Sequence, residues 1–377
     1  MMKVMTVVGT RPELIKLSRV IAEFDTSFEH VLVHTGQNFD YELNQIFFEQ
    51  LDIRKPDEFL GAAGGSAMQT IGNVLVGGDE LFGKHRPDAL LILGDTNSCL
   101  IALAAKRRRI PIFHMEAGNR CFDQRVPEEI NRRIIDHISD INLTYTEHAR
   151  RYLLAEGIRA ETVIKTGSPM KEVIAHHEAG IGASEVLSEL GLVPKSYFVV
   201  SAHREENVDD PARLAQLVAC VNALAAAHDM PVIFSVHPRT RQRLDAQREL
   251  PLDRRVRVMK PLGFLDYAKL QSNSFCVVSD SGTITEESAL LGFAAITIRQ
   301  AHERPEGMDE GTLIMSDLHP QRVCEAVKLV AAHRESGARF RLPPDYDIDM
   351  VSKKVARIVA SYVDYVRRTV WSDQPSP

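Results

Sequence analysis

Acidic residues follow two neighbouring apolar runs in the first half of the chain. Asp95 comes directly after one run and Glu116 directly after the next, while Glu128 lies twelve residues further on, behind Pro127. A Pro followed by two acids is typical of the first turn of a helix. Carboxylates held near one another and near cations can divide the roles of acid and base. This grouping predicts a proton-transfer site, whereas any one acid alone would be read as stabilising a helix dipole.

A possible anion site lies at the start of the chain. Gly9 and Thr10 end the first apolar run, and Thr10 with Glu13 three residues later matches a capping box that opens a helix. Arg11 and Lys16 lie in the first turns of that helix, so unpaired amides, the helix dipole and two cations converge. We interpret the segment as a phosphate site, with a solvated surface turn as the alternative.

The second half of the chain carries matching features. Ser281 and Gly282 precede a helix bearing Glu287, so we expect their amides to hold a diphosphate and Glu287 to accept ribose hydroxyls. His203 follows another strand and could donate to phosphate or move a proton, the alternative being a hydrogen-bonded structural histidine. Arg304 adds a cation after a further strand.

The elements that must position these residues alternate between strands and helices. Short β-branched runs, each followed by helical spacing, indicate βα units and an α/β fold with two similar parallel sheets. We expect ligands beyond the carboxyl ends of the strands, in a central cleft that the sheets face. The predicted strands are residues 3–8, 31–34, 89–93, 111–115, 141–145, 162–166, 197–201, 231–236, 255–259, 275–279 and 294–298.

The domain organisation follows from length and from Gly and Pro placement. A chain of 377 residues suggests two domains of ordinary size. Gly and Pro flank helix-like stretches between the two sets of strands, so we place the boundary near residues 170–195. We expect an N-terminal Rossmann-like domain over 1–170 and a C-terminal Rossmann-like domain, which holds the diphosphate, over 171–350. A closing helix and a polar tail are expected over 351–377.

Composition excludes several classes of function. The 45 Lys and Arg against 51 Asp and Glu give a net charge of −6, so the chain has no basic field for nucleic acid and no polybasic membrane signal. No apolar run reaches the length of a membrane helix. Five scattered cysteines form no C-x-x-C pair and fit free thiols in a reducing cytoplasm.

Several other motifs resemble functional sites but do not fit them. Residues 78–84 fit P-loop spacing, but His85 replaces the Ser or Thr that would hold magnesium. The basic run 106–109 is interpreted as a solvated helix end, and His176 with His177 as surface residues. The alternating acids at 345, 347 and 349 lie in a Pro-rich connector. We therefore expect no metal. The sequence also lacks a G-x-G-x-x-G segment after the first strand, which is the usual binding motif for a nicotinamide cofactor.

Eight ordered motifs resemble one known family. The strings are GTRPE, GDTNS, HMEAGNR, PEEINR, SAHREEN, HPRTR, SDSGTITEES and AHERPEG, and they span about residues 3–370. They resemble the non-hydrolysing UDP-N-acetylglucosamine 2-epimerases, which have the glycosyltransferase-B architecture and interconvert UDP-N-acetylglucosamine and UDP-N-acetylmannosamine. HTGQNFDYELN, EAGNRCFDQRVPEE and KPLGFLDYAKLQ are similar to the branch that makes UDP-N-acetyl-L-fucosamine for surface polysaccharides from a 6-deoxy-L-talose-type UDP-sugar.

The resemblance implies roles for individual residues. The catalytic acids fall on Asp95, Glu116 and Glu128, and the resemblance implies a catalytic role for His203 as well. It implies no cofactor, a UDP-sugar substrate and a homodimer. The residues expected to bind the UDP-sugar are Arg11, Lys16, Arg132, His203, Ser281, Gly282, Glu287 and Arg304.

The chain departs from the family pattern at two places. Thr283 stands where a second Gly is common, and residues 36–41 replace a Gln-His-Arg segment that contributes to activation by substrate in some members. Such regulation is therefore not expected to carry over unchanged.

The chemistry that this site would perform follows from the substrate. The hydrogen on carbon 2 is barely acidic, so we expect elimination of UDP to a 2-acetamidoglycal, followed by re-addition with a proton on the other face. Domain closure would retain the intermediate. The alternatives are a hydrolysing epimerase, a glycosyltransferase with an acceptor pocket, and a non-catalytic nucleotide-sugar sensor.

Overall fold

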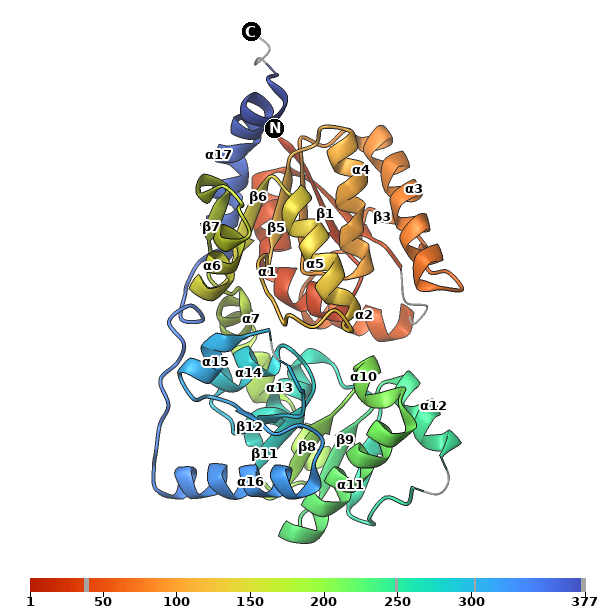
Figure 1. Ribbon diagram of the computed structural model, residues 1–377, viewed down its shortest axis with the longest axis vertical. Coiled ribbons are helices and arrows are strands. Elements are labelled where there is room, and N and C mark those ends of the chain that lie inside the picture. The colour runs from red at the N-terminus through yellow and green to blue at the C-terminus, as the bar shows by residue number, and fades with distance from the viewer. Residues whose placement is uncertain (37–40, 248–249, 302, 374–377) are drawn as a thin grey trace. The chain divides into compact units, whose positions relative to one another are not determined.

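The computed structural model describes residues 1–36, 41–247, 250–301 and 303–373, and it divides into two compact units (Figure 1). Unit 1 comprises Met1–His176 and Pro344–Pro377, and unit 2 comprises His177–Pro343. Each unit is described by itself. Most of the 36–41 segment, where the sequence departs from the family pattern, lies outside the described residues.

Unit 1 contains a sheet of seven parallel strands in the order β3-β2-β1-β4-β5-β6-β7. Its strands are β1 Lys3–Val8, β2 Glu29–His34, β3 Glu58–Phe59, β4 Ala89–Leu93, β5 Ile112–Met115, β6 Ile141–Thr144 and β7 Val163–Lys165. The order reverses at β1 and β4, and ligands of open α/β sheets bind at the carboxyl ends of the strands beside such a switch point.

Unit 2 repeats this plan with six parallel strands in the order β10-β9-β8-β11-β12-β13. Its strands are β8 Phe198–Ser201, β9 Val232–Ser235, β10 Val256–Met259, β11 Cys276–Ser279, β12 Ala295–Thr297 and β13 Ile314–Met315. Here the switch point lies between β8 and β11.

Helices connect the strands in both units. Those of unit 1 are α1 Arg11–Ser27, α2 Tyr41–Gln50, α3 Ala67–His85, α4 Ala102–Arg107, α5 Pro127–Ile138, α6 Glu147–Ala155, α7 Met170–His176 and α17 Val351–Trp371, with short 3-10 turns η1 Asn97–Ile101 and η2 Ala160–Thr162. Those of unit 2 are α8 Glu178–Ala183, α9 Val186–Glu189, α10 Glu205–Val208, α11 Pro211–His228, α12 Pro238–Ala246, α13 Phe264–Asn273, α14 Ile284–Leu291, α15 Pro305–Asp309 and α16 Pro320–Glu335.

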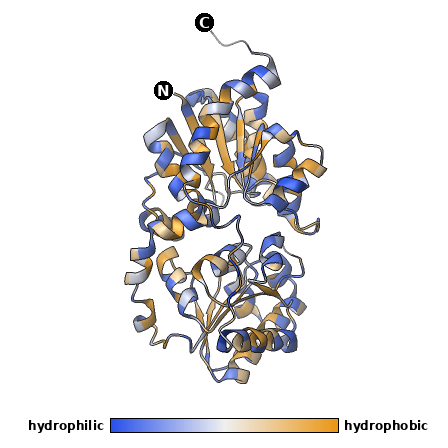
Figure 2. Ribbon diagram, turned by 90° about the vertical axis from the view of Figure 1, so that its left-hand side faces the viewer, coloured by the Kyte–Doolittle hydropathy of each residue, from blue (hydrophilic) through white to orange (hydrophobic). Residues whose placement is uncertain are grey.

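The α/β prediction is confirmed, and each of the eleven predicted strands is present with ends that differ by at most two residues. Strands β3 and β13 were not predicted, because two residues are too few to show a pattern. The strands are mostly apolar, as Figure 2 shows by their colour, and most of their residues are buried, as is typical of parallel sheets covered by helices. Sequence periodicity was therefore sufficient to locate the sheets.

The C-terminal helix α17 packs against α1 in unit 1, although the two helices lie at opposite ends of the chain (Figure 1). It buries one apolar stripe that includes Val351, Val355, Val359 and Val363. Within the part of the chain that the structure describes, neither α17 nor any other helix has the length and apolar character needed to cross a membrane.

The burial of this stripe predicts a difference between two valines of α17. Val359 is fully buried and Val370 is 47% exposed. We expect Val359→Ala to lower the free energy of unfolding by about 1–3 kcal/mol, because it removes buried methyl groups and leaves a cavity. Val370→Ala should change it by less than about 0.5 kcal/mol. Urea denaturation of both variants checks the difference, and equal effects would contradict the packing.

Candidate functional site

The turn between β1 and α1 forms the predicted capping box. The Glu13 carboxylate accepts hydrogen bonds from the Gly9 and Thr10 amides at 2.5 and 2.9 Å, and Thr10 occupies the N-cap position of the helix. A side chain at Gly9 would collide with Ser98 and Thr35, so the turn has to pass close to both neighbouring segments. Arg11 lies just inside the helix, with its guanidinium 5.7 Å from the ring centroid of Phe47.

Lys16 forms a buried ion pair with an acid on another segment of unit 1. Its Nζ is 2.6 Å from Oε2 of Glu116, and the two side chains are only 3% and 12% exposed. The sequence interpretation placed Lys16 in an anion site on the first helix. The structure adds that this cation reaches from α1 to the segment after β5, where it lies against the carboxylate of Glu116.

Asp95 lies two residues after the end of β4, which pairs with β5, the strand that leads to Glu116. Its Oδ2 is 2.7 Å from Arg132 of α5, and its carbonyl oxygen accepts a hydrogen bond from Asn131 at 3.0 Å. A Cβ added at Gly94 would lie 4.0 Å from Oε2 of Glu116. The acids that follow neighbouring strands are thus brought to the same edge of the sheet, as expected.

Glu128 lies in the first turn of α5, where Pro127 starts the helix as predicted. Among the described residues its carboxylate has no hydrogen bond or ion pair, and it is half-buried. The adjacent Glu129 is fully buried and binds Arg132 and the Cys121 amide. Of this pair, Glu128 is the acid available to a ligand, and Glu129 is structural.

A fourth acid in this region was assigned only a capping role from sequence. Oε1 of Glu13 accepts a hydrogen bond from the Thr96 hydroxyl at 2.5 Å, which ties α1 to the residue after Asp95. Burial raises the pKa of Glu13 to about 7, although its three hydrogen bonds oppose that shift. The Thr10 and Glu13 pattern carried the capping signal, but nothing in it pointed to Thr96.

In unit 2, a buried aspartate organises the segment that follows β8. Asp280 accepts hydrogen bonds from the amides of His203 and Arg204 and from the side chain of Asn207. The His203 ring is half-exposed, and its Nδ1 lies 3.3 Å from Oδ1 of Asp280. Because Asp280 binds the backbone amides of His203 and Arg204, His203 is held just after the end of β8 with its side chain half-exposed.

The turn before α14 differs in one respect from the sequence interpretation. The Ser281 amide donates to Oγ of Ser279 at 3.0 Å, so this amide is already used within the turn. The Ser281 hydroxyl lies 3.0 Å from the Thr283 hydroxyl. Glu287, in the first turn of α14, accepts a hydrogen bond from Gln271 at 2.8 Å. The hydroxyls and the Gly282 amide therefore remain the better candidates for a diphosphate.

Three arginines surround Gly282. Arg304 is buried, donates to the Gly282 carbonyl at 2.8 Å and lies 3.3 Å from Glu286. Glu303 lies 2.8 Å from Arg299 and 3.5 Å from Arg204, and its Oε2 would be 3.4 Å from a Cβ at Gly282. Arg304 was predicted from sequence. Arg299 and Arg204 were not singled out, although both also follow predicted strands.

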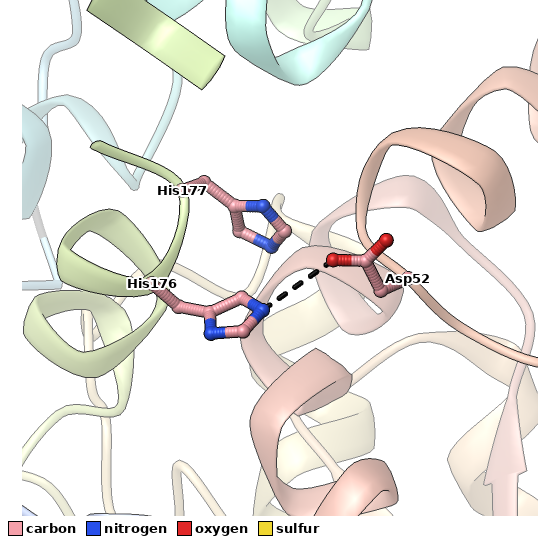
Figure 3. A group of neighbouring side chains, drawn as sticks. All are labelled: Asp52, His176 and His177. Atoms are coloured by element: carbon pink, nitrogen blue, oxygen red, sulfur yellow. Dashed lines mark hydrogen bonds and ion pairs between the residues drawn. The ribbon is translucent and has the colours of Figure 1, made fainter. Parts of the chain in front are cut away.

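His176, the last residue of the first segment of unit 1, and His177, the first residue of unit 2, have different surroundings (Figure 3). His176 Nε2 lies 3.4 Å from Oδ2 of Asp52 and 3.1 Å from the guanidinium of Arg19. A guanidinium at that nitrogen disfavours a metal ion there. The His177 ring packs edge-on against Phe264 within unit 2 and is buried. The interpretation of both histidines as surface residues is therefore wrong for His177.

Comparison with known proteins places the chain in a family. The profile of the family described as UDP-N-acetylglucosamine 2-epimerase matches residues 22–360. A UDP-N-acetylglucosamine 2-epimerase structure from Rickettsia bellii is 54% identical, with a TM-score of 0.92 over 99% of this chain and 100% of that one. The structure of the Methanocaldococcus jannaschii UDP-GlcNAc 2-epimerase in complex with UDP-GlcNAc and UDP is 31% identical, with a TM-score of 0.89 over 95% and 99% of the chains.

A curated relative acts on a different sugar. The UDP-2,3-diacetamido-2,3-dideoxy-D-glucuronate 2-epimerase of Pseudomonas aeruginosa is 36% identical over 87% of this chain and 92% of its own length. Two Rossmann-like units with parallel sheets define the glycosyltransferase-B-like class of fold. Within that class, the chain belongs to the UDP-N-acetylglucosamine 2-epimerase family.

The environment of Glu13 predicts a pH-dependent stability. The folded pKa of about 7 lies above the ordinary value of 4.5, so the folded protein binds the proton more tightly than the unfolded chain. Its stabilisation is complete below about pH 4.5 and is lost as the pH rises through about 7. Glu13→Gln mimics the protonated acid and should abolish this dependence.

Urea denaturation between pH 5 and 8 measures the effect. Relative to Glu13→Gln, the wild type should lose roughly 2.5 kcal/mol of unfolding free energy between pH 5 and pH 8. A difference that stays constant with pH would contradict the assignment.

Proposed function

We propose that this protein is a non-hydrolysing UDP-N-acetylhexosamine 2-epimerase that inverts carbon 2 by eliminating and re-adding UDP. The observation that carries the proposal is the grouping of acids and cations at one edge of the unit 1 sheet. Asp95 pairs with Arg132 and Glu116 with Lys16, on segments that follow the adjacent strands β4 and β5. Glu128 lies on α5, which also carries Arg132.

The reaction needs an acid and a base on opposite faces of the sugar. The base takes the carbon 2 hydrogen, the electron pair of that bond forms a double bond between carbons 1 and 2, and UDP leaves with the electrons of the carbon 1–oxygen bond. Re-addition of UDP, with a proton delivered to the other face of carbon 2, gives the epimer. Asp95, Glu116 and Glu128 share these transfers in our proposal, because carboxylates in different environments can divide such roles.

The charge that develops on the diphosphate requires a second set of groups. His203, the Ser281 and Gly282 turn, and the arginines beside it supply donors and positive charge in unit 2. Removing one preorganised donor to a developing anion typically costs about 3–4 kcal/mol of barrier. Arg11 and Lys16 lie at the start of α1 and are further candidates to bind the anionic substrate.

Both the sugar and the reaction class have alternatives. We propose that the substrate is UDP-N-acetylglucosamine or the 6-deoxy-L-talose-type sugar of the UDP-N-acetyl-L-fucosamine branch, and that the product serves surface polysaccharide synthesis. The three related proteins reported above carry names with two different sugars. A hydrolysing epimerase or a glycosyltransferase would use the same UDP site, and product analysis distinguishes them. We expect a cytoplasmic homodimer.

The catalytic role of Glu116 is tested by its amide variant. Each candidate UDP-sugar is incubated in heavy water and examined by NMR for deuterium at carbon 2. Wild type should return an intact UDP-sugar carrying deuterium, and Glu116→Gln should lower this rate at least ~10³-fold because no base remains at that position. UDP affinity should stay within about threefold, because most of the groups that we propose to bind UDP lie in unit 2.

The matched control is Asp79→Asn, which removes an exposed acid that pairs with Arg108 outside the site. This variant should retain the wild-type rate. A near-normal rate for Glu116→Gln would contradict its role, and the release of free sugar and UDP would favour the hydrolysing alternative.

Glu287 is tested through the ribose. If it accepts a ribose hydroxyl, Glu287→Gln should weaken UDP binding by about 10-fold or more, because a charge-assisted hydrogen bond is lost. Calorimetry with UDP and 2′-deoxy-UDP completes a double-mutant cycle. Wild type should prefer UDP, and the variant should discriminate much less. Equal discrimination by the two proteins would place the ribose elsewhere.

A further inference from the structure

The backbone around Glu116 adopts a costly conformation. Glu116 has φ +63° and Gly118 has φ +83°, both in the left-handed region. For a residue with a side chain this conformation costs about 1–2 kcal/mol, so the surroundings have to hold it in place. A Cβ at Gly118 would lie only 2.4 Å from the Ala149 carbonyl oxygen, so the segment also passes close to α6.

One buried carboxylate holds this segment. Both oxygens of Asp136 on α5 accept the Gly118 amide, at 3.2 and 3.3 Å, and Oδ2 also accepts a hydrogen bond from Arg120 at 2.7 Å. Asp136 and Arg120 have no exposed side-chain surface. Asp136 therefore binds the backbone two residues after Glu116 and the arginine side chain four residues after it.

The same carboxylate also reaches the Asp95 segment. His114 Nδ1 lies 3.0 Å from Oδ1 of Asp136, and its Nε2 lies 2.8 Å from the carbonyl oxygen of Gly94. Since a carbonyl only accepts, Nε2 carries a hydrogen and donates to Gly94, the residue before Asp95. Asp136 thus lies against the imidazole whose other nitrogen supports the end of β4, although its contact with Nδ1 lacks hydrogen-bond geometry.

The charge of Asp136 is paired with Arg120, which also binds a second acid. Arg120 binds Glu156 through two hydrogen bonds of 2.8 and 2.6 Å on the side away from Asp136. These bonds with Arg120 lower the pKa of Glu156. The other groups that face the cluster are Arg133 and His137 of α5, which lie 3.9 and 3.2 Å from Glu156. The arginine is held from both sides, so Asp136 has a fixed partner.

We propose that Asp136 is a positioning residue that fixes Glu116 and Asp95 in their reactive geometry, an inference that rests on the proposed function. It lies on the same helix as Glu128 and Arg132, but nearer the C-terminal end of that helix. An acid near a helix C-terminus is disfavoured by the dipole, so its burial there calls for compensating partners such as Arg120 and the Gly118 amide.

Asp140 provides a matched control within the same unit. It is also buried, forms an ion pair with Lys106, and accepts a backbone hydrogen bond from Ile112 at 3.0 Å. Ile112 begins β5, at the end of the strand opposite to Glu116. Asp136→Asn and Asp140→Asn therefore make the same chemical change to two buried acids. The first binds the segment that follows β5, and the second binds the residue that begins β5.

The test measures kcat, KM, UDP affinity and thermal midpoint for both variants, together with hydrogen exchange of the peptide that spans 115–121. Asp136→Asn should lower kcat about 100-fold, because a shift of about 1 Å at a reacting group has that effect. Its KM and UDP affinity should stay within about threefold, and exchange over 115–121 should accelerate. Asp140→Asn should keep kcat within about threefold of wild type, even if its thermal midpoint falls as much as that of Asp136→Asn.

Equal kcat values for the two variants would overturn the positioning role. If Asp136→Asn does not fold, Asp136→Glu takes its place, since it keeps the charge but displaces the carboxylate by one methylene, and the same loss of kcat is expected. A wild type that exchanges carbon 2 hydrogen while both variants behave alike refutes only this inference. A wild type that exchanges no hydrogen on any candidate sugar refutes the proposed function as well.

Discussion

The buried ion pair between Lys16 and Glu116 is the interaction on which the site in unit 1 depends. It joins α1, which follows the first strand, to the segment that follows β5, and both side chains are almost fully removed from solvent. A buried acid and cation that lost each other would each carry a large desolvation cost. The pair therefore requires α1 and the β5 segment to be fixed, and Glu13 and Asp136 supply the hydrogen bonds that fix them.

Helix α5 connects the remaining parts of this site. Its first turns carry Glu128, together with Asn131 and Arg132, which hold Asp95, and its last turn carries Asp136. A single rigid helix thus contacts the segments of both strand-end acids. Rigid support of this kind favours proton transfer, because the reacting groups need not reorganise during the reaction. Unit 2 has a comparable organiser in Asp280, which holds the backbone at His203.

The sequence was informative wherever a local pattern decides the structure. The β-branched runs located the strands, and Pro127 with its paired acids located the start of α5. It was less informative where a contact joins distant segments. The bond from Glu13 to Thr96 and the burial of His177 against Phe264 arise only in the folded unit. The bond from the Ser281 amide to the Ser279 hydroxyl, two residues away, is a local contact that the sequence pattern did not show.

The central claim is that the bond between the sugar and UDP breaks and re-forms during epimerisation. It is tested by placing ¹⁸O in the oxygen that bridges carbon 1 and the β-phosphorus of a UDP-sugar that the enzyme epimerises. Our account predicts that part of the label moves to non-bridging positions of the β-phosphate in the recovered UDP-sugar, because the free diphosphate rotates before re-addition. Inversion of carbon 2 with the label wholly retained in the bridge would contradict it.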